Sequence, residues 1–162
     1  MAASEKPQII TPPNTLGVKI PSQGGPDLKA IMSDAEAALE DLEEDYHRWV
    51  LEDLDAAAEA LATATADADQ RTAMIEKLFD ICHNIKGQAA TFGFPLLTLI
   101  AQSVCALITA DQAGAEERLP LIRSHIDAMK VVASQNIRGP GGKLGEELVS
   151  TLHVAVKKAL AG

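Results

Sequence analysis

Residues 79–95, FDICHNIKGQAATFGFP, decide the fold of this chain. Apolar side chains recur through this stretch, and through the residues before it, at the spacing of an amphipathic helix. The stripe that we expect to face the core consists of Met74, Leu78, Ile81, Cys82, Ile85, Ala89 and Phe92. His83 lies off this stripe, because at about 100° per residue Ile81 and Ile85 each point roughly 160° away from it. We therefore expect its imidazole to be exposed to solvent near the middle of the helix.

Two residues beside His83 bear on its chemistry. Gly87 costs a helix interior about 1 kcal/mol relative to alanine, so its place one turn after His83 indicates close approach by another molecule's backbone. Lys86 opposes protonation of the ring but favours a doubly negative group attached to it. An exposed histidine alone is usually an ordinary surface residue, whereas this combination suits a histidine that becomes phosphorylated.

The run HNIKGQAATFGF at residues 83–94 is an HxxKG motif followed by small residues and Phe-Gly. It resembles the histidine phosphotransfer (HPt) domain of bacterial phosphorelays. It is also similar to the first, phosphate-accepting domain of chemotaxis histidine kinases, which has the same fold. The resemblance implies an all-α protein, an antiparallel four-helix bundle of the HPt type.

The same resemblance assigns roles to individual residues. His83 accepts a phosphoryl group from a receiver-domain aspartate and passes it to the aspartate of another receiver. Lys86 neutralises the charge of that group, and Gln88 is a candidate hydrogen-bond donor to it. The surface on which a receiver docks would consist of Phe79, Asp80, Gly87 and Ala90. The receiver supplies Mg²⁺, so this chain needs no cofactor of its own.

One departure from the family pattern bears on the kind of carrier. Where the chemotaxis kinase domain usually has a His and a Glu that assist phosphorylation from ATP, this chain has Gln102 and Cys105. No nucleotide-binding motif occurs either. We therefore favour a stand-alone phosphorelay carrier without a kinase domain. Two alternatives stay open: a phosphoacceptor module of a chemotaxis-type kinase, and a helical adaptor that is never phosphorylated.

Composition limits the classes of partner. Among the 162 residues, aromatic side chains make up 3%, which favours helix packing over a sheet. A net charge of -9 argues against nucleic-acid binding and against an anionic membrane surface. No apolar run is long enough to span a membrane, and no signal peptide is expected. We expect a cytoplasmic monomer whose partners are receiver domains.

Breaks in the helical pattern divide the chain into three parts. Residues 1–26 form an arm rich in proline, either extended on the bundle or mobile; residues 27–138 form the HPt-like bundle; residues 139–162 form a Gly-rich turn and a last helix. The expected helices cover residues 27–65, 70–92, 95–110, 117–136 and 144–160. Asp27 is the expected N-cap of the first, which the pattern allows as one helix or two.

Turn residues and inward stripes complete the prediction. Gly93 suits the left-handed position after a helix end, and Pro95 suits the first turn of the next helix. Pro120 is compatible with a helix only within the first turn. The expected inward residues of the last three helices are Leu96, Leu97, Leu99, Ile100, Val104, Leu107, Ile108, Leu119, Ile122, Ile126, Met129, Val132, Ala133, Leu148, Leu152, Val156 and Leu160.

The remaining reactive side chains show no motif. Cys82 and Cys105 lie on apolar helix faces and are expected to be reduced core cysteines. His47, His125 and His153 stand apart from one another, so we expect them at the surface or at helix borders, and no metal site. The acidic side of the first helix is either a solvated face or a selector that repels wrong partners.

Overall fold

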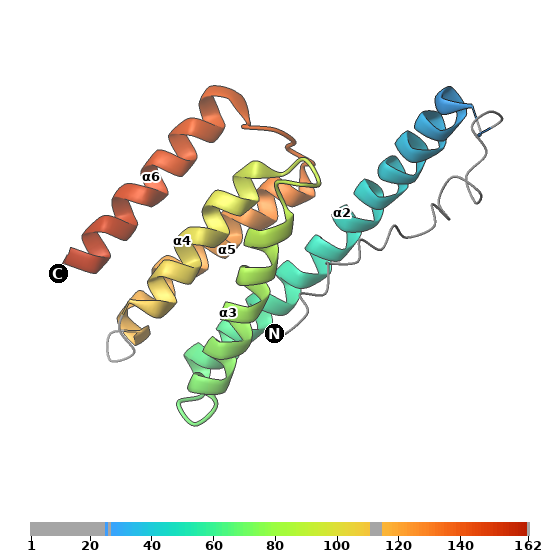
Figure 1. Ribbon diagram of the computed structural model, residues 1–162. Coiled ribbons are helices and arrows are strands. Elements are labelled where there is room, and N and C mark those ends of the chain that lie inside the picture. Colours follow the sequence, from blue (N-terminus) through green and yellow to red (C-terminus); the bar gives the residue numbers. More distant parts are fainter. Residues whose placement is uncertain (1–24, 26, 111–114, 162) are drawn as a thin grey trace, which may run out of the picture. The chain divides into compact units, whose positions relative to one another are not determined.

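The computed structural model describes residues 25, 27–110 and 115–161, and all regular structure in these ranges is helical (Figure 1). The helices are α2 (Leu28–Ala66), α3 (Arg71–Gln88), α4 (Pro95–Thr109), α5 (Ala115–Ser134) and α6 (Gly142–Ala161). The predicted all-α class is therefore confirmed. Apart from Gly25, the arm predicted over residues 1–26 lies outside the described residues.

The described residues fall into two compact units, one ending at Ala38 and the other beginning at Leu39. α2 is a single helix of 39 residues that continues across this division. Asp27 caps its start, because the Lys29 amide donates to the Asp27 carboxylate at 3.1 Å. Within the larger unit the buried residues of α2 begin at Tyr46, whereas Leu39 and Leu42 before it and Trp49 after it are about half exposed.

One hydrophobic core fills the unit that begins at Leu39, and all five helices contribute to it. α4 contacts α3, α5 and α6, and α5 contacts α6. The largest fully buried side chains are Phe94, Leu54, Leu61, Leu78, Ile85, Leu97, Ile100, Leu107, Ile122, Ile126, Met129 and His125. Each such aliphatic side chain contributes roughly 1.5–3 kcal/mol by its removal from water. This core holds the helices that carry the candidate residues.

The connection from α3 to α4 is closed by backbone hydrogen bonds. α3 ends at Gln88, four residues before the expected end, and a turn covers residues 89–93. The Phe94 amide donates to the Ala89 carbonyl at 2.8 Å and the Gly93 amide to the Ala90 carbonyl at 3.2 Å, which is the Schellman pattern. Gly93 has φ +83°, and Pro95 opens α4, as the sequence indicated.

α5 differs from the prediction at its start. It begins at Ala115, so Pro120 is its sixth residue and lies inside the helix, beyond the first turn. The helix accommodates the ring because the missing N–H leaves one carbonyl, that of Glu116, without its bond near the helix end. The predicted inward stripe of α5 is confirmed, since all six of its residues are buried.

α6 is fixed to α4 by close packing around Gly145. A Cβ at this position would lie 2.3 Å from the Pro140 carbonyl oxygen and 3.2 Å from the Leu96 side chain. Leu152 and Val156 are buried as predicted. Leu160 is 42% exposed and Leu99 of α4 is 45% exposed, so both were wrongly predicted to face inward. They line a gap that α6 leaves beside α4.

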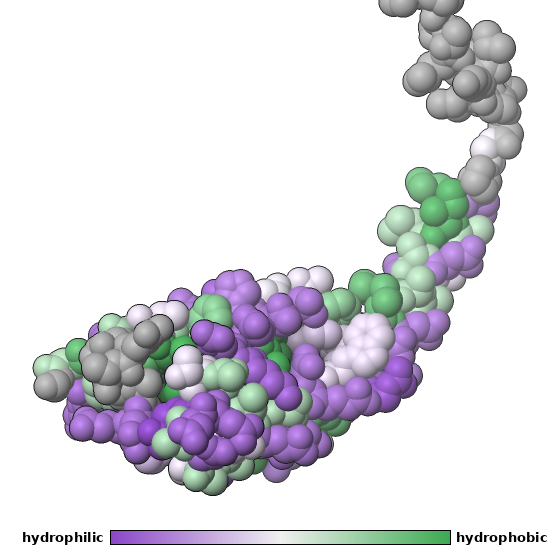
Figure 2. All heavy atoms as spheres, turned by 90° about the horizontal axis from the view of Figure 1, so that it is seen from below, coloured by the Kyte–Doolittle hydropathy of each residue, from purple (hydrophilic) through white to green (hydrophobic). Residues whose placement is uncertain are grey.

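The surface agrees with the acidic composition. Figure 2 shows that hydrophilic side chains cover most of the visible face of the larger unit, with smaller apolar patches between them. Among the described residues, no helix combines the length and the apolar character that a membrane span requires.

Candidate functional site

His83 stands on the solvent side of α3. Leu78, Cys82 and Ile85 of the same helix are buried and hold α3 against the core. The side chain of His83 is exposed, as its place off the apolar stripe predicted. Because the anchoring residues surround it in sequence, the core fixes the direction in which the imidazole leaves the helix.

Phe79 gives the imidazole a fixed neighbour. The two rings lie one helical turn apart, with centroids 5.6 Å from each other and planes inclined by 37°. Phe79 is itself half-buried and packs against the core. Within the described part of the chain the His83 ring makes no hydrogen bond, and the side chain is exposed to solvent. The ring is thus oriented by packing while its nitrogens stay accessible.

Gly87 leaves an open space one turn after His83. Beyond the backbone of its own helix and its two chain neighbours, a Cβ built on this residue would meet no atom of the described residues within 4 Å. Packing among these residues therefore does not require glycine here, although glycine lowers helix stability by about 1 kcal/mol relative to alanine. The space is available to another molecule, and it lies beside the imidazole.

Lys86 lies on the α4 side of this surface. It is half-buried in the last turn of α3. Burial raises the pKa of the Cys105 thiol on α4, and the positive charge of Lys86 opposes this shift. Lys86 is therefore close enough to α4 to act on Cys105 electrostatically, and it follows His83 by less than one turn.

The other predicted site residues are distributed along the same end of α3. Asp80, Gln88 and Ala90 are exposed. Asp80 lies on the same side as His83, one turn before it. Gln88 is five residues after His83, so helical geometry turns it about 140° away from the imidazole. Ala90 lies in the turn that follows α3. The helix thus brings Phe79, Asp80, Lys86 and Gly87 around His83, whereas Gln88 and Ala90 lie farther along.

An aromatic cluster that the sequence did not reveal supports the turn after α3. Tyr46 stacks on Phe92 with centroids 4.4 Å apart, and His47 stacks on Phe94 at 5.8 Å. His47 Nε2 also hydrogen-bonds the Ala133 carbonyl at 2.8 Å. Burial, and to a lesser degree the charge of Asp53, raises the pKa of Tyr46 to about 12. No sequence signal short of the three-dimensional contacts links these residues.

The segment after α5 closes the same end. The Arg138 guanidinium lies 5.1 Å from the Phe94 ring centroid and forms an ion pair with Glu43 of α2. The Gly139 amide donates to the Gly93 carbonyl at 2.8 Å. From the sequence, this stretch was predicted only to end a helix. In the structure, its contacts hold the turn that begins six residues after His83.

The two cysteines are buried free thiols, as expected for core residues. Burial, together with the neighbouring Cys105, raises the pKa of Cys82 to about 12. A thiol with so high a pKa stays protonated near neutral pH and is a poor nucleophile. Neither the geometry nor the pKa of Cys82 suits it to nucleophilic chemistry.

His125 was wrongly predicted to lie at the surface or at a helix border. It is fully buried, with Nδ1 2.8 Å from the Leu121 carbonyl, and Nε2 finds no hydrogen-bond partner among the described residues. Burial lowers its pKa, and the bond to Leu121 opposes this shift. His47 is half-buried and His153 is exposed. In residues 25, 27–110 and 115–161 no three potential ligands come together as a metal site would need.

The comparisons with known proteins point to one family. A family model described as "Hpt domain" matches residues 28–131. A search of curated proteins and a search of solved structures returned no significant match.

Proposed function

Because the chain belongs to the Hpt domain family, we propose that His83 is a phosphorelay carrier residue that takes a phosphoryl group from one receiver-domain aspartate and passes it to another. Hpt domains act in histidine phosphotransfer in two-component signalling and interact with receiver domains. They are carrier modules rather than kinases. The observation that carries the proposal is the open space at Gly87 beside an exposed imidazole.

The transfer needs only one nucleophile from this chain. The lone pair of an unprotonated imidazole nitrogen attacks the phosphorus of an aspartyl phosphate on the partner. The P–O bond to the aspartate breaks, and its electron pair stays on the carboxylate that leaves. Transfer to the next receiver is the same exchange in reverse, with a carboxylate oxygen as the attacking atom. Mg²⁺ on the receiver would orient and neutralise the group in flight.

The residues around His83 serve this exchange in three ways. Phe79 and Gly87 give the receiver a flat surface, on which Asp80 and Ala90 extend the contact. Lys86 offsets the negative charge of the phosphorylated ring, since the nearest other charged side chain on this face of α3 is the carboxylate of Asp80. Gln88 would reach the phosphoryl group only by extending its side chain back along the helix, so its role is the least supported.

The same proposal extends to the architecture and cellular setting. The shared core of α2, α3, α4 and α5 supports an antiparallel four-helix bundle over residues 27–138, with residues 139–162 as an added turn and helix and residues 1–26 as an arm. We further propose a cytoplasmic monomer without a cofactor of its own.

A transfer assay tests the proposed role of His83. The full chain is mixed with each phosphorylated receiver domain of its host, and the label on both proteins is followed over time. His83→Gln should lose all transfer, whereas His153→Gln, which alters another exposed histidine, should transfer normally. Lys86→Met should slow the exchange at low salt more than at high salt. Transfer by His83→Gln would refute the assignment.

The assay also separates the two alternatives. A helical adaptor would bind its partner equally well with and without His83 and would carry no label. A phosphoacceptor module of a chemotaxis-type kinase would take its label from an ATP-binding domain rather than from a receiver. The buried, protonated Cys105 lies where that class usually has its assisting carboxylate, and this disfavours the kinase module.

A further inference from the structure

α6 leaves an open cavity where it runs beside α4, away from the residues assigned to phosphoryl transfer. The cavity has a volume of about 510 Å³, which lies within the range of about 300–1,000 Å³ typical of small-molecule sites. Much of its lining is aliphatic, from Leu99 and Ala106 on α4 and from Val149, Val156 and Leu160 on α6. Exposed leucines at its edge would be covered by an apolar ligand.

The polar lining groups of this cavity carry only positive or neutral charge. Lys157 and His153 line it from α6, and Gln102 and Ser103 from α4, with no acidic side chain among the lining residues. Within residues 27–110 and 115–161, Lys157 forms no ion pair with an acidic side chain. In a chain of net charge -9, a cavity with a lone ammonium group favours an anion.

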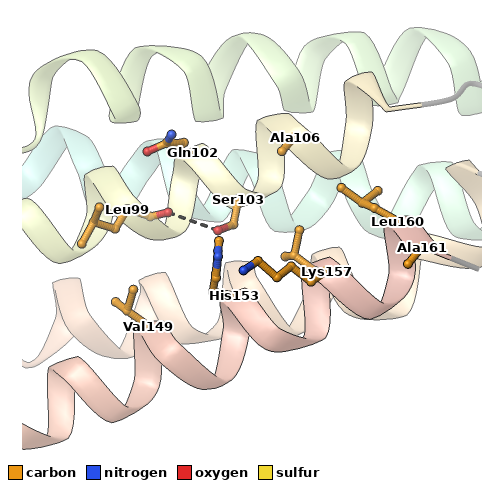
Figure 3. Close-up of a pocket in the computed structure, with 10 residues that line it drawn as sticks. Leu99, Gln102, Ser103, Ala106, Val149, His153, Lys157, Leu160 and Ala161 are labelled. Atoms are coloured by element: carbon orange, nitrogen blue, oxygen red, sulfur yellow. Dashed lines mark hydrogen bonds between the residues drawn. The ribbon is translucent and has the colours of Figure 1, made fainter.

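The directions of the side chains set where that anion would lie. Figure 3 shows the His153 ring pointing from α6 toward Ser103, and the Lys157 side chain running along the cavity toward His153. The Ser103 hydroxyl donates to the Leu99 carbonyl at 3.3 Å, so its hydrogen is used within α4. Gln102 points toward α3 in the same view. The ammonium of Lys157 and the His153 ring therefore meet at one place, with aliphatic surface on both sides.

We propose that the cavity between α4 and α6 binds a small amphipathic organic anion, a carboxylate with an aliphatic body. The carboxylate would pair with Lys157 and accept a hydrogen bond from His153, while the aliphatic part covers Leu99, Val149 and Leu160. Charge complementarity selects the anion, and the aliphatic lining selects the chain attached to it. The site depends on α6, which lies beyond the residues matched by the family model.

Titration with octanoate, followed by amide NMR spectra of the full chain, tests the proposal. Shifts should concentrate at residues 99–106 of α4 and 149–161 of α6, with a dissociation constant on the order of 1 mM for so small a ligand. Neutral octanol should bind the same residues more weakly. Octylammonium should bind least, because its charge has the sign of Lys157.

Two variants and their controls test the lining residues. Lys157→Gln should weaken octanoate binding by about 1.5-fold to fivefold, the range of an exposed ion pair, without changing octanol binding. Lys158→Gln removes the neighbouring charge, which does not line the cavity, and should bind octanoate normally. Ala106→Leu should block both ligands, and melting curves verify that each variant is folded.

Several outcomes would overturn the site. These are shifts outside α4 and α6, equal binding of octanoate and octylammonium, or equal losses in Lys157→Gln and Lys158→Gln. Binding that appears only with a protein partner would contradict a small-molecule site. His83→Gln should bind octanoate normally, so this proposal and the phosphotransfer proposal fail independently.

Discussion

Glycine at position 87 lowers the stability of α3, and its own contacts do not compensate for this loss. An alanine would fit its position without a new contact to any neighbouring element among the described residues, and it would stabilise α3. Packing within the described part of the chain therefore gives no reason for glycine. A partner that must bring its backbone close to His83 gives one, because any side chain here would stand between the two surfaces.

Replacing Gly87 by glutamate should separate folding from transfer. We expect Gly87→Glu to keep the helical fold but to slow transfer from a receiver by about 100-fold, since reacting atoms must approach to about 3–3.5 Å and a misplacement near 1 Å can cost that much. Gly87→Ala should raise the free energy of unfolding by up to about 1 kcal/mol. Transfer kinetics and urea unfolding of both variants provide the measurement, and normal transfer by Gly87→Glu would contradict the close-approach argument.

α6 is an element whose position depends on one small residue. Gly145 faces the Pro140 carbonyl and the Leu96 side chain, and neither leaves space for a methyl group. The apolar face of α6 then continues through Leu152 and Val156 into the core. The rest of α6 can contact α4 in register only if this first contact is close.

Gly145→Ala should therefore loosen α6 despite its better helix propensity. The added Cβ forces the Pro140 carbonyl or the helix to move, which we expect to cost about 1–3 kcal/mol as overpacking. Gly87→Ala is the matched control, because it adds the same group to a helix in open space. Melting curves and hydrogen exchange of α6 amides measure the effect, and a Gly145→Ala protein as stable as the control would refute the packing account.

The sequence predicted helices and turns well where local chemistry decides them. The stripe around His83, the cap at Asp27 and the left-handed Gly93 all follow from spacing or from a single residue's conformational preference. It failed for Leu99 and Leu160, because whether a stripe residue is covered depends on how closely the neighbouring helix lies. Pro120 was misplaced for a related reason, since the start of α5 depends on packing and not on the proline alone.

The core of the larger unit contains a titratable group, His125, that should make the whole fold sensitive to acid. Burial holds the pKa of this imidazole below its ordinary value. The unfolded chain therefore binds the proton more readily than the folded one. The contribution of the neutral His125 ring to the free energy of unfolding is fully present above the unfolded-state pKa of about 6.5. It is lost as the pH falls from there through the folded-state pKa.

We expect the free energy of unfolding to fall with decreasing pH below about 6.5, with a slope of at most about 1.4 kcal/mol per pH unit from this residue. Urea unfolding between pH 5 and pH 7.5 measures it. His125→Gln should flatten the slope, whereas His153→Gln should keep it, because the ring of His153 is exposed. Equal slopes in the two variants would show that other groups dominate the acid response.

The candidate site shows that the sequence reveals chemistry carried by neighbouring residues but not contacts between residues far apart in the chain. His83, Lys86 and Gly87 were recognised because the chemistry lies within five consecutive residues. The contacts of Tyr46 and Arg138 with the turn after α3 were not recognised, because they join segments far apart in the chain. Arg138 and its ion-pair partner Glu43, for example, are separated by 95 positions. Such pairings become visible only when the core brings the segments together.

The hydrogen bond from the Gly139 amide to the Gly93 carbonyl has a practical consequence for protein engineering. The segment matched as an Hpt domain ends at residue 131, but the chain that closes over the turn after α3 continues to Gly139. A chimera joined at residue 131 would lose this bond and the Arg138 guanidinium over Phe94. A chimera should therefore place its junction after Gly141, so that the transferred segment keeps the hydrogen bond between Gly139 and Gly93 and the contact of Arg138 with Phe94.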